Sequence, residues 1–135
     1  MREILFRGKR VDNGKWVYGF YCHYNDTEDN GKDDCDYIIE KHNGDHFPFV
    51  EVSPETICQY TGLTDKNGNK IFEGDTLKLL GSKLYKVYFD KAEARFQMNG
   101  CDDEHAFHKC VSFCEIVGNI HDNPELTDSG WEMRQ

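Results

Sequence analysis

Long apolar segments are missing from this 135-residue sequence. No stretch approaches the roughly 18 consecutive apolar residues typical of a transmembrane helix, and no charged-then-apolar leader opens the chain. We therefore expect no membrane partner and a location in the cytoplasm where the protein is made. In that reducing compartment the six cysteines, at positions 22, 35, 58, 101, 110 and 114, are expected to be thiols.

Recognisable catalytic motifs are missing as well. The sequence contains no Gly-x-Ser-x-Gly, no phosphate-binding glycine loop and no His-Glu-x-x-His. A thiol site would need Cys58 beside a histidine, but nothing in the sequence places it next to His23, His42 or His46. We therefore expect no enzymatic activity and no resident cofactor.

Paired carboxylates and calcium-like loops offer no clear site either. Glu73 and Asp75 flank a turn, where solvated acids are the usual outcome. The loop that opens at Asp26 has EF-hand spacing but ends on Tyr37, where a bidentate Glu is required. The loop that opens at Asp65 fails at its glycine and twelfth positions. A weak cation site in 26–36 stays open.

Aromatic residues and turn signals are abundant. The chain has 9 Phe, 7 Tyr and 2 Trp, and rings favour pleated, half-buried strands. Asn13-Gly14 predicts a hairpin turn, and Asn67-Gly68 predicts a second turn. After Gln59, short strand patterns alternate with turns every 8–12 residues or so, which is typical of a small barrel or sandwich. Plausible core anchors are Trp16, Tyr18, Tyr60 and Phe72.

Five collinear motifs resemble the YopX family. They are Arg7-Gly8-Lys9-Arg10, Gly14 to Gly19, Gln59 to Asp65, Gly68 to Asp75 and Val117 to Leu126. The resemblance runs from Met1 to about Leu126. It implies a protein encoded by a phage or prophage, in a bacterial host cell, with an unknown biochemical role and an SH3-like second half. It carries over no catalytic residue.

These observations predict an all-β fold, with short helices at most, in two lobes. We expect an N-terminal β lobe over 1–56 with an acidic loop at 25–36, an SH3-like barrel over 57–126 and a frayed tail over 127–135. Such a protein suits docking onto a host or phage protein. Self-association into a homo-oligomer belongs to the same class, because barrel edges can pair between chains.

Nucleic-acid binding is the alternative function. The net charge of −9 opposes it, because an acidic protein repels phosphate backbones. The N-terminal segment is a local exception, with basic groups beside aromatic rings that suit phosphates and bases. The candidate binding residues, for nucleic acid or another partner, are Arg2, Arg7, Lys9, Arg10, Lys15 and Trp16.

A cluster of soft ligands in the second half offers a candidate zinc site. Zinc takes four nitrogen or sulfur ligands in a tetrahedron, and five such side chains fall within fourteen residues. The cluster lacks the close Cys-x2-Cys pairs of common structural zinc sites, so ordinary buried thiols are the alternative. The candidate ligands are Cys101, His105, His108, Cys110 and Cys114.

Overall fold

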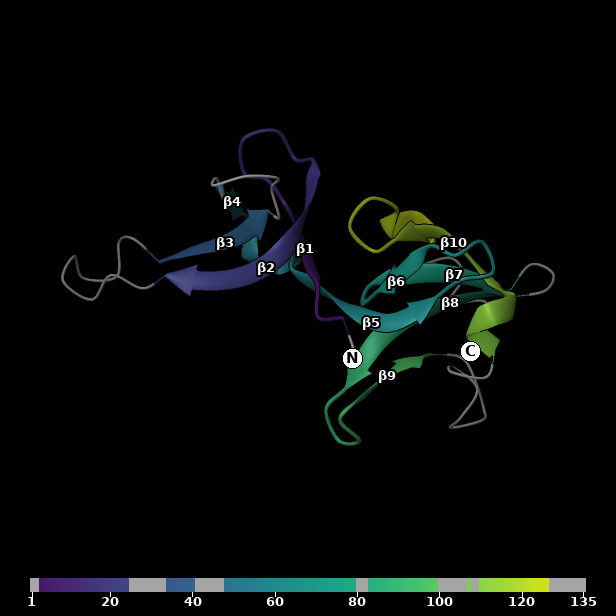
Figure 1. Ribbon diagram of the computed structural model, residues 1–135. Helices are drawn as coiled ribbons and strands as arrows, with labels where there is room; N and C mark the ends of the chain where they lie inside the picture. The colour runs from purple at the N-terminus through teal and green to yellow at the C-terminus, as the bar shows by residue number, and fades with distance from the viewer. Residues whose placement is uncertain are drawn as a thin grey trace. The chain divides into compact units, whose positions relative to one another are not determined.

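The computed structural model describes residues 3–24, 34–40, 48–79, 83–99, 107 and 110–126. Strands dominate it (Figure 1), and the predicted all-β class is confirmed. The chain divides into two compact units, Met1–Gln59 and Tyr60–Gln135. The lobe boundary expected after residue 56 thus lies three residues before the boundary between the units.

The first unit is an antiparallel sheet in the order β4-β3-β2-β1. The predicted hairpin at Asn13-Gly14 is confirmed: it joins β1 to β2, and Gly14 takes the left-handed φ of +72° that such a turn requires. Pro48 precedes the edge strand, where a missing N–H is tolerated. The strands are β1 (Phe6–Lys9), β2 (Trp16–Tyr24), β3 (Cys35–Glu40) and β4 (Phe49–Val52).

This sheet curls around a small aliphatic core. Its buried centre consists of Val17, Ile38 and Val52. The end of β4 is bridged back to the segment after β1, since Arg10 pairs with Val52 and the Ser53 N–H donates to the Lys9 carbonyl. Pro54–Thr56 then forms a single 3-10 turn, η2, with Pro54 at its start, where a missing N–H costs no hydrogen bond.

The second unit holds the rest of the chain. Strand β5 (Cys58–Thr64) begins in the first unit, where Cys58 and Gln59 pair with β1, and continues in the second, where it pairs with β6 (Lys70–Phe72). Four further strands form a separate antiparallel sheet in the order β10-β7-β8-β9. They are β7 (Asp75–Leu79), β8 (Lys83–Asp90), β9 (Arg95–Met98) and β10 (Cys114–Asn119), with the 3-10 turn η3 (Val111–Phe113) before β10.

The core of the second unit is larger than that of the first. It consists of Ile71, Leu77, Tyr85, Val87, Met98, Phe107, Val111 and Cys114. Among the strands that the structure describes, no pairing closes this sheet into a barrel: β9 and β10 are its edges. The SH3-like barrel therefore stays a prediction for this unit.

Two expectations about individual side chains were wrong. Tyr18 is 47% exposed rather than a core anchor, because it lies on the sheet face opposite the aliphatic core. Asp75 is 1% exposed rather than solvated, because its Oδ2 accepts a hydrogen bond from the Phe72 N–H at 2.8 Å. Tyr60 and Phe72 are buried as predicted, and Trp16 is half-buried. The tail from residue 127 onward lies outside the described residues.

Candidate functional site

The outer face of the first-unit sheet is the strongest candidate for a site. Side chains alternate between the two faces of a strand, so Val17 points inward while Tyr18, Phe20 and Tyr24 of β2 point outward. The strand registers extend this face across the sheet, since Cys22 lies opposite Tyr37. Ile39 of β3 in turn lies opposite Phe49 of β4. We define the aromatic face as Tyr18, Phe20, Tyr24, Tyr37 and Phe49.

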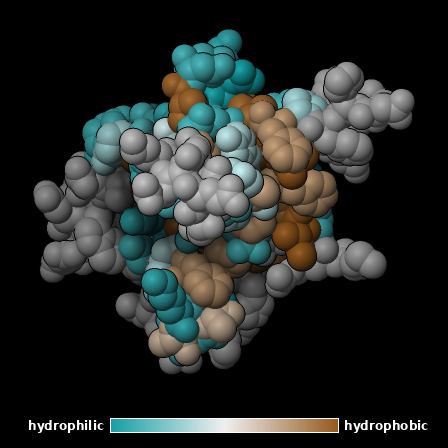
Figure 2. Space-filling model, turned by 90° about the vertical axis from the view of Figure 1, so that its left-hand side faces the viewer, coloured by the Kyte–Doolittle hydropathy of each residue, from teal (hydrophilic) through white to brown (hydrophobic). Residues whose placement is uncertain are grey.

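Most of these rings are exposed. Phe49 is 61%, Phe20 55% and Tyr24 53% exposed. An antiparallel sheet with one buried face normally presents polar side chains on the other. Figure 2 shows apolar side chains gathered together, rather than scattered singly, on the face of the molecule that it draws. Grouped apolar exposure of this kind marks interaction surfaces.

A pocket is hollowed into this face. It has a volume of about 380 Å³ and is lined by Cys22, Tyr24, Tyr37 and Phe49. The Tyr37 and Phe49 rings lie 6.1 Å apart between centroids and are tilted by 54°. Glu51, an exposed residue of β4, lies directly opposite Tyr37 on the same face. The pocket is therefore aromatic with a carboxylate beside it.

The predicted basic residues lie toward the other end of the face. The Arg7 guanidinium carbon stacks 4.5 Å from the centre of the Trp16 ring, and the Lys9 ammonium lies 5.4 Å from it. Arg7 is only 6% exposed. The structure thus brings Arg7, Lys9 and Trp16 together, but Arg7 is buried.

Among the described residues, no contact joins the remaining basic candidates to this stack. Arg10 makes two hydrogen bonds of 2.8 Å to the carboxylate of Asp12, which raises the Arg10 pKa. Lys15 is exposed in the hairpin turn. Arg2 lies outside the described residues.

A polar cluster occupies the inner side of the same sheet, near the end of β2. Tyr21 donates a hydrogen bond to Asp36 Oδ1, and His23 Nδ1 lies 2.9 Å from the same oxygen. The hydrogen bond to the Asp36 carboxylate raises the pKa of Tyr21 to about 12. It also lowers the pKa of Asp36, with a further contribution from His23. These contacts fasten β2 to β3 through a charged hydrogen bond.

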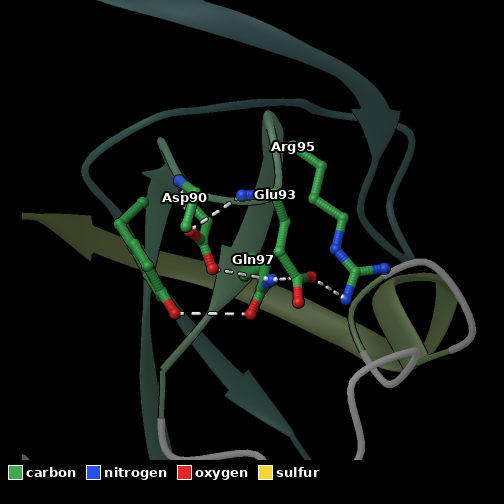
Figure 3. Close-up of polar contacts among 6 residues, drawn as sticks. Asp90, Glu93, Arg95 and Gln97 are labelled. Atoms are coloured by element: carbon green, nitrogen blue, oxygen red, sulfur yellow. Dashed lines mark hydrogen bonds and ion pairs between the residues drawn. The ribbon is translucent and has the colours of Figure 1, made fainter.

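A second polar cluster lies at the β8–β9 hairpin, shown in Figure 3. Gln97 donates to Asp90 and Glu93 at 3.1 Å each, and Glu93 pairs with Arg95 at 2.6 Å. Asp90 Oδ1 also accepts the Ala92 N–H at 2.9 Å. Because these polar groups satisfy one another across the turn, the cluster is explained by hairpin geometry.

The candidate zinc ligands are described only in part. Cys114 is fully buried in the second-unit core, and its Sγ donates to the Cys110 carbonyl at 3.3 Å. Among the residues that the structure describes, no group of three or more His, Cys, Asp or Glu is placed to hold a metal ion. Cys101, His105 and His108 lie outside the described residues, so zinc binding stays a prediction.

The hypothetical thiol site is not assembled by its described members. Cys58 is buried opposite Arg7 and donates to the Thr56 carbonyl at 3.2 Å. Arg7 in turn pairs with Tyr18. His23 lies five residues further along β2 and, because 18 and 23 differ by an odd number, on the opposite face. His42 and His46 lie outside the described residues.

Our interpretation of the sequence missed the aromatic face, although a signal for it was present. Positions 16, 18, 20 and 24 carry Trp, Tyr, Phe and Tyr, while 17 and 19 carry Val and Gly. Large rings with period two beside small residues predict two unlike faces. Sequence alone assigns Trp16 and Tyr18 to the core because buried aromatics are the usual case, but the small core of the first unit is built from aliphatic side chains.

The comparisons with known proteins give one family and one similar fold. Residues 5–128 match the family described as YopX protein. The chain is similar to the crystal structure of protein EF1440 from Enterococcus faecalis, with a TM-score of 0.57 and 23% identity, covering 93% of this chain and 99% of that one. At this identity the likeness shows the fold alone. No curated protein matches the chain. Within the described residues, none of the helices has the length and apolar character needed to cross a membrane.

Proposed function

The chain belongs to the YopX family, and from the aromatic face of its first unit we propose that it is a non-enzymatic protein-interaction module. The observation that carries this proposal is the position of the rings on the solvent side of the sheet. Phe20 and Phe49, at 55% and 61% exposure, lie on either side of Ile39. Large apolar rings held in water are stabilised when a partner covers them.

The composition of the face favours a protein partner. Protein interfaces are enriched in Tyr, Trp, Phe, Met and Arg, and their strongest contributors are aromatic anchors that fill pockets. The face supplies Tyr and Phe on three neighbouring strands and a pocket of about 380 Å³ among them. A rigid sheet presents these groups without a large loss of conformational entropy on binding.

The resemblance to phage and prophage proteins suggests where that partner is met. We propose that the protein acts in the cytoplasm of a bacterial host cell as a phage or prophage accessory protein. Its partner is then a host or phage protein, or a second copy of the chain. Sedimentation at several protein concentrations separates the last case from the other two.

Nucleic acid remains the second candidate, because Arg7 and Lys9 lie beside Trp16 and open rings can stack on bases. The charges argue against it. Arg7 is buried and Arg10 is paired with Asp12, and residues 1–59 carry twelve Asp and Glu against seven Lys and Arg. Few cations are thus left to release counterions from a phosphate backbone.

The test is an affinity capture from host lysate with and without nuclease. The wild-type protein is compared with a Phe20→Thr, Phe49→Thr variant, which removes two exposed rings and keeps residues suited to strands. Phe113→Thr is the matched control, because Phe113 in the second unit is 62% exposed. We expect a stoichiometric protein that survives nuclease, is retained by the Phe113 variant and is lost with the double variant.

Two outcomes would contradict this proposal. A partner captured equally by the double variant and the wild type would remove the aromatic face from the interaction. Capture of only nuclease-sensitive material would favour the nucleic-acid alternative, and Lys9→Gln together with Lys15→Gln would then be the variants to compare.

A further inference from the structure

We propose that the pocket lined by Cys22, Tyr24, Tyr37 and Phe49 receives an arginine side chain of the protein partner. This inference rests on the proposed docking function of the aromatic face. It adds the chemistry of the group that the pocket recognises. Three features of the pocket support it: its rings, its charge and its size.

The rings provide surfaces that attract a cation. Tyr24 of β2, Tyr37 of β3 and Phe49 of β4 bring three aromatic side chains from three neighbouring strands to one pocket. The face of an aromatic ring carries negative potential, and a cation within about 6 Å of its centre is attracted to it. Arginine suits such a site better than lysine, because its planar guanidinium stacks on rings and is more weakly hydrated.

The charge around the pocket also favours a cation. Glu51 is exposed and lies opposite Tyr37 on the pocket's own face. Glu51 is not part of the pocket lining, but its charge on the same face adds an attraction for a cation bound there. The acidic balance of residues 1–59 adds a long-range attraction for a basic partner.

Arg7, the buried cation of the same face, lies away from the pocket. Arg7 pairs with Tyr18, and Cys22 lies four residues further along β2. At about 3.3 Å per residue that separation is about 13 Å, which exceeds the Debye length of about 8 Å in physiological salt. Lys9 lies nearer, since the Ser53 and Val11 N–H groups donate to the Lys9 and Glu51 carbonyls, but its ammonium lies over the Trp16 ring.

The size and stiffness of the pocket fit a long side chain. A volume of about 380 Å³ is near the lower end of small-molecule sites, which span roughly 300–1,000 Å³. It accommodates an arginine side chain with part of its backbone. The Arg7–Trp16 stack at 4.5 Å shows that a ring of this same sheet already holds a guanidinium.

The test uses two capped pentapeptides of glycine with one central residue, arginine in the first and citrulline in the second. Citrulline has nearly the same shape as arginine but no charge. Each peptide is titrated into ¹⁵N-labelled full-length protein, and amide shifts are followed by NMR. We expect the arginine peptide to shift the amides of Cys22, Tyr24, Tyr37 and Phe49 and to bind at least about fivefold more tightly than citrulline.

Two variants and one control sharpen the test. Phe49→Leu keeps an apolar side chain but removes the ring, and Glu51→Gln removes the charge. Each variant is expected to weaken the affinity for the arginine peptide by about threefold or more. Phe113→Leu, with the same ring loss at a similarly exposed position, is expected to leave binding unchanged.

The outcomes separate this inference from the docking proposal. Equal binding of arginine and citrulline, or no shift at the pocket with either peptide, would overturn the arginine inference. The docking function would still stand if capture of the partner depended on Phe20 and Phe49. Arginine binding with capture unaffected by the Phe20 and Phe49 variants would support the pocket chemistry and overturn the docking function.

Discussion

Asp65 fastens its own turn to the last strand of the second unit. Its Oδ2 accepts a hydrogen bond from the Ile116 N–H at 3.1 Å, across 51 residues of sequence, while Oδ1 accepts the N–H groups of Asn67 and Asn69 at 2.9 Å each. Burial opposes ionisation of this carboxyl, but the three backbone donors outweigh it and lower the Asp65 pKa. The turn with calcium-like spacing is therefore a structural clamp.

Replacing Asp65 should destabilise the protein. Asp65→Ala leaves three backbone N–H groups without their acceptor at a site that is 5% exposed, and we expect the free energy of unfolding to fall by about 2–4 kcal/mol. Asp90→Ala, which removes an exposed turn acceptor, is the control and should cost about 1 kcal/mol or less. Urea denaturation measures both.

Calcium provides an independent check on the same residue. Because both Asp65 oxygens already accept backbone hydrogen bonds, millimolar calcium should leave the melting temperature of the wild type unchanged. A rise with calcium that disappears in Asp65→Ala would show that the turn binds the cation after all.

Local signals predicted the turns, whereas long-range contacts decided the environments of single residues. Asn13-Gly14 predicts its hairpin because Gly14 readily takes the positive φ that the turn needs. Asp75 looks in sequence like any solvated turn acid; its burial depends on Phe72 and on the pairing of β7 with β10, whose residues lie about forty positions away. Tyr18 faces solvent because the first unit curls around three aliphatic side chains.

Gly19 is expected to tolerate no side chain. A Cβ at this position would lie 2.0 Å from the Ile39 carbonyl oxygen, which is backbone and cannot rotate away. Gly19→Ala should therefore reduce the free energy of unfolding by about 3 kcal/mol or more, or prevent folding. Circular dichroism melts and expression yield measure the effect.

Gly14→Ala is the matched control for that substitution. Gly14 has open space around it, and only its φ of +72° disfavours a side chain. Gly14→Ala should therefore reduce the free energy of unfolding by about 1 kcal/mol. Equal costs at the two positions would contradict the close approach of β2 and β3.

The two faces of β2 should respond differently to substitution. Val17 is 5% exposed, and Val17→Ala is expected to lower the free energy of unfolding by about 2 kcal/mol. Phe20→Thr, at 55% exposure, should change it by less than about 1 kcal/mol. Urea denaturation of the two variants tests the face assignment. A large loss of unfolding free energy in Phe20→Thr would mean that the ring belongs to the core and is not free to contact a partner.

The Tyr21–Asp36 hydrogen bond should make stability depend on pH. The folded-state pKa of Asp36 is lowered, so its contribution is present above the ordinary carboxyl value near 4 and is lost as the pH falls through the folded value. The pKa of Tyr21 is raised to about 12, so its contribution is present below about 10 and is lost as the pH rises through 12.

Tyr21→Phe should therefore lose stability relative to wild type by a constant amount between about pH 5 and 9, and by less below about pH 4. Urea denaturation at several pH values measures the difference. Tyr24→Phe controls for the loss of a hydroxyl from an exposed ring. A Tyr21→Phe deficit that persists undiminished at pH 2 would show that Asp36 is not the partner responsible.

Cys114, the buried cysteine of the zinc candidate, should differ in reactivity from the cysteines of the first-unit sheet. Cys114 is 0% exposed within the second-unit core, whereas Cys22 and Cys35 are half-buried on the first-unit sheet. Because alkylation requires access to the thiolate, iodoacetamide should modify Cys22 and Cys35 in the native protein and Cys114 only after denaturation. Mass spectrometry of the alkylated peptides measures this. Stoichiometric zinc in the purified protein, with alkylation of Cys114 once the zinc is removed, would support the zinc hypothesis. A protein that contains no zinc and still protects Cys114 would show that packing alone accounts for the buried thiol.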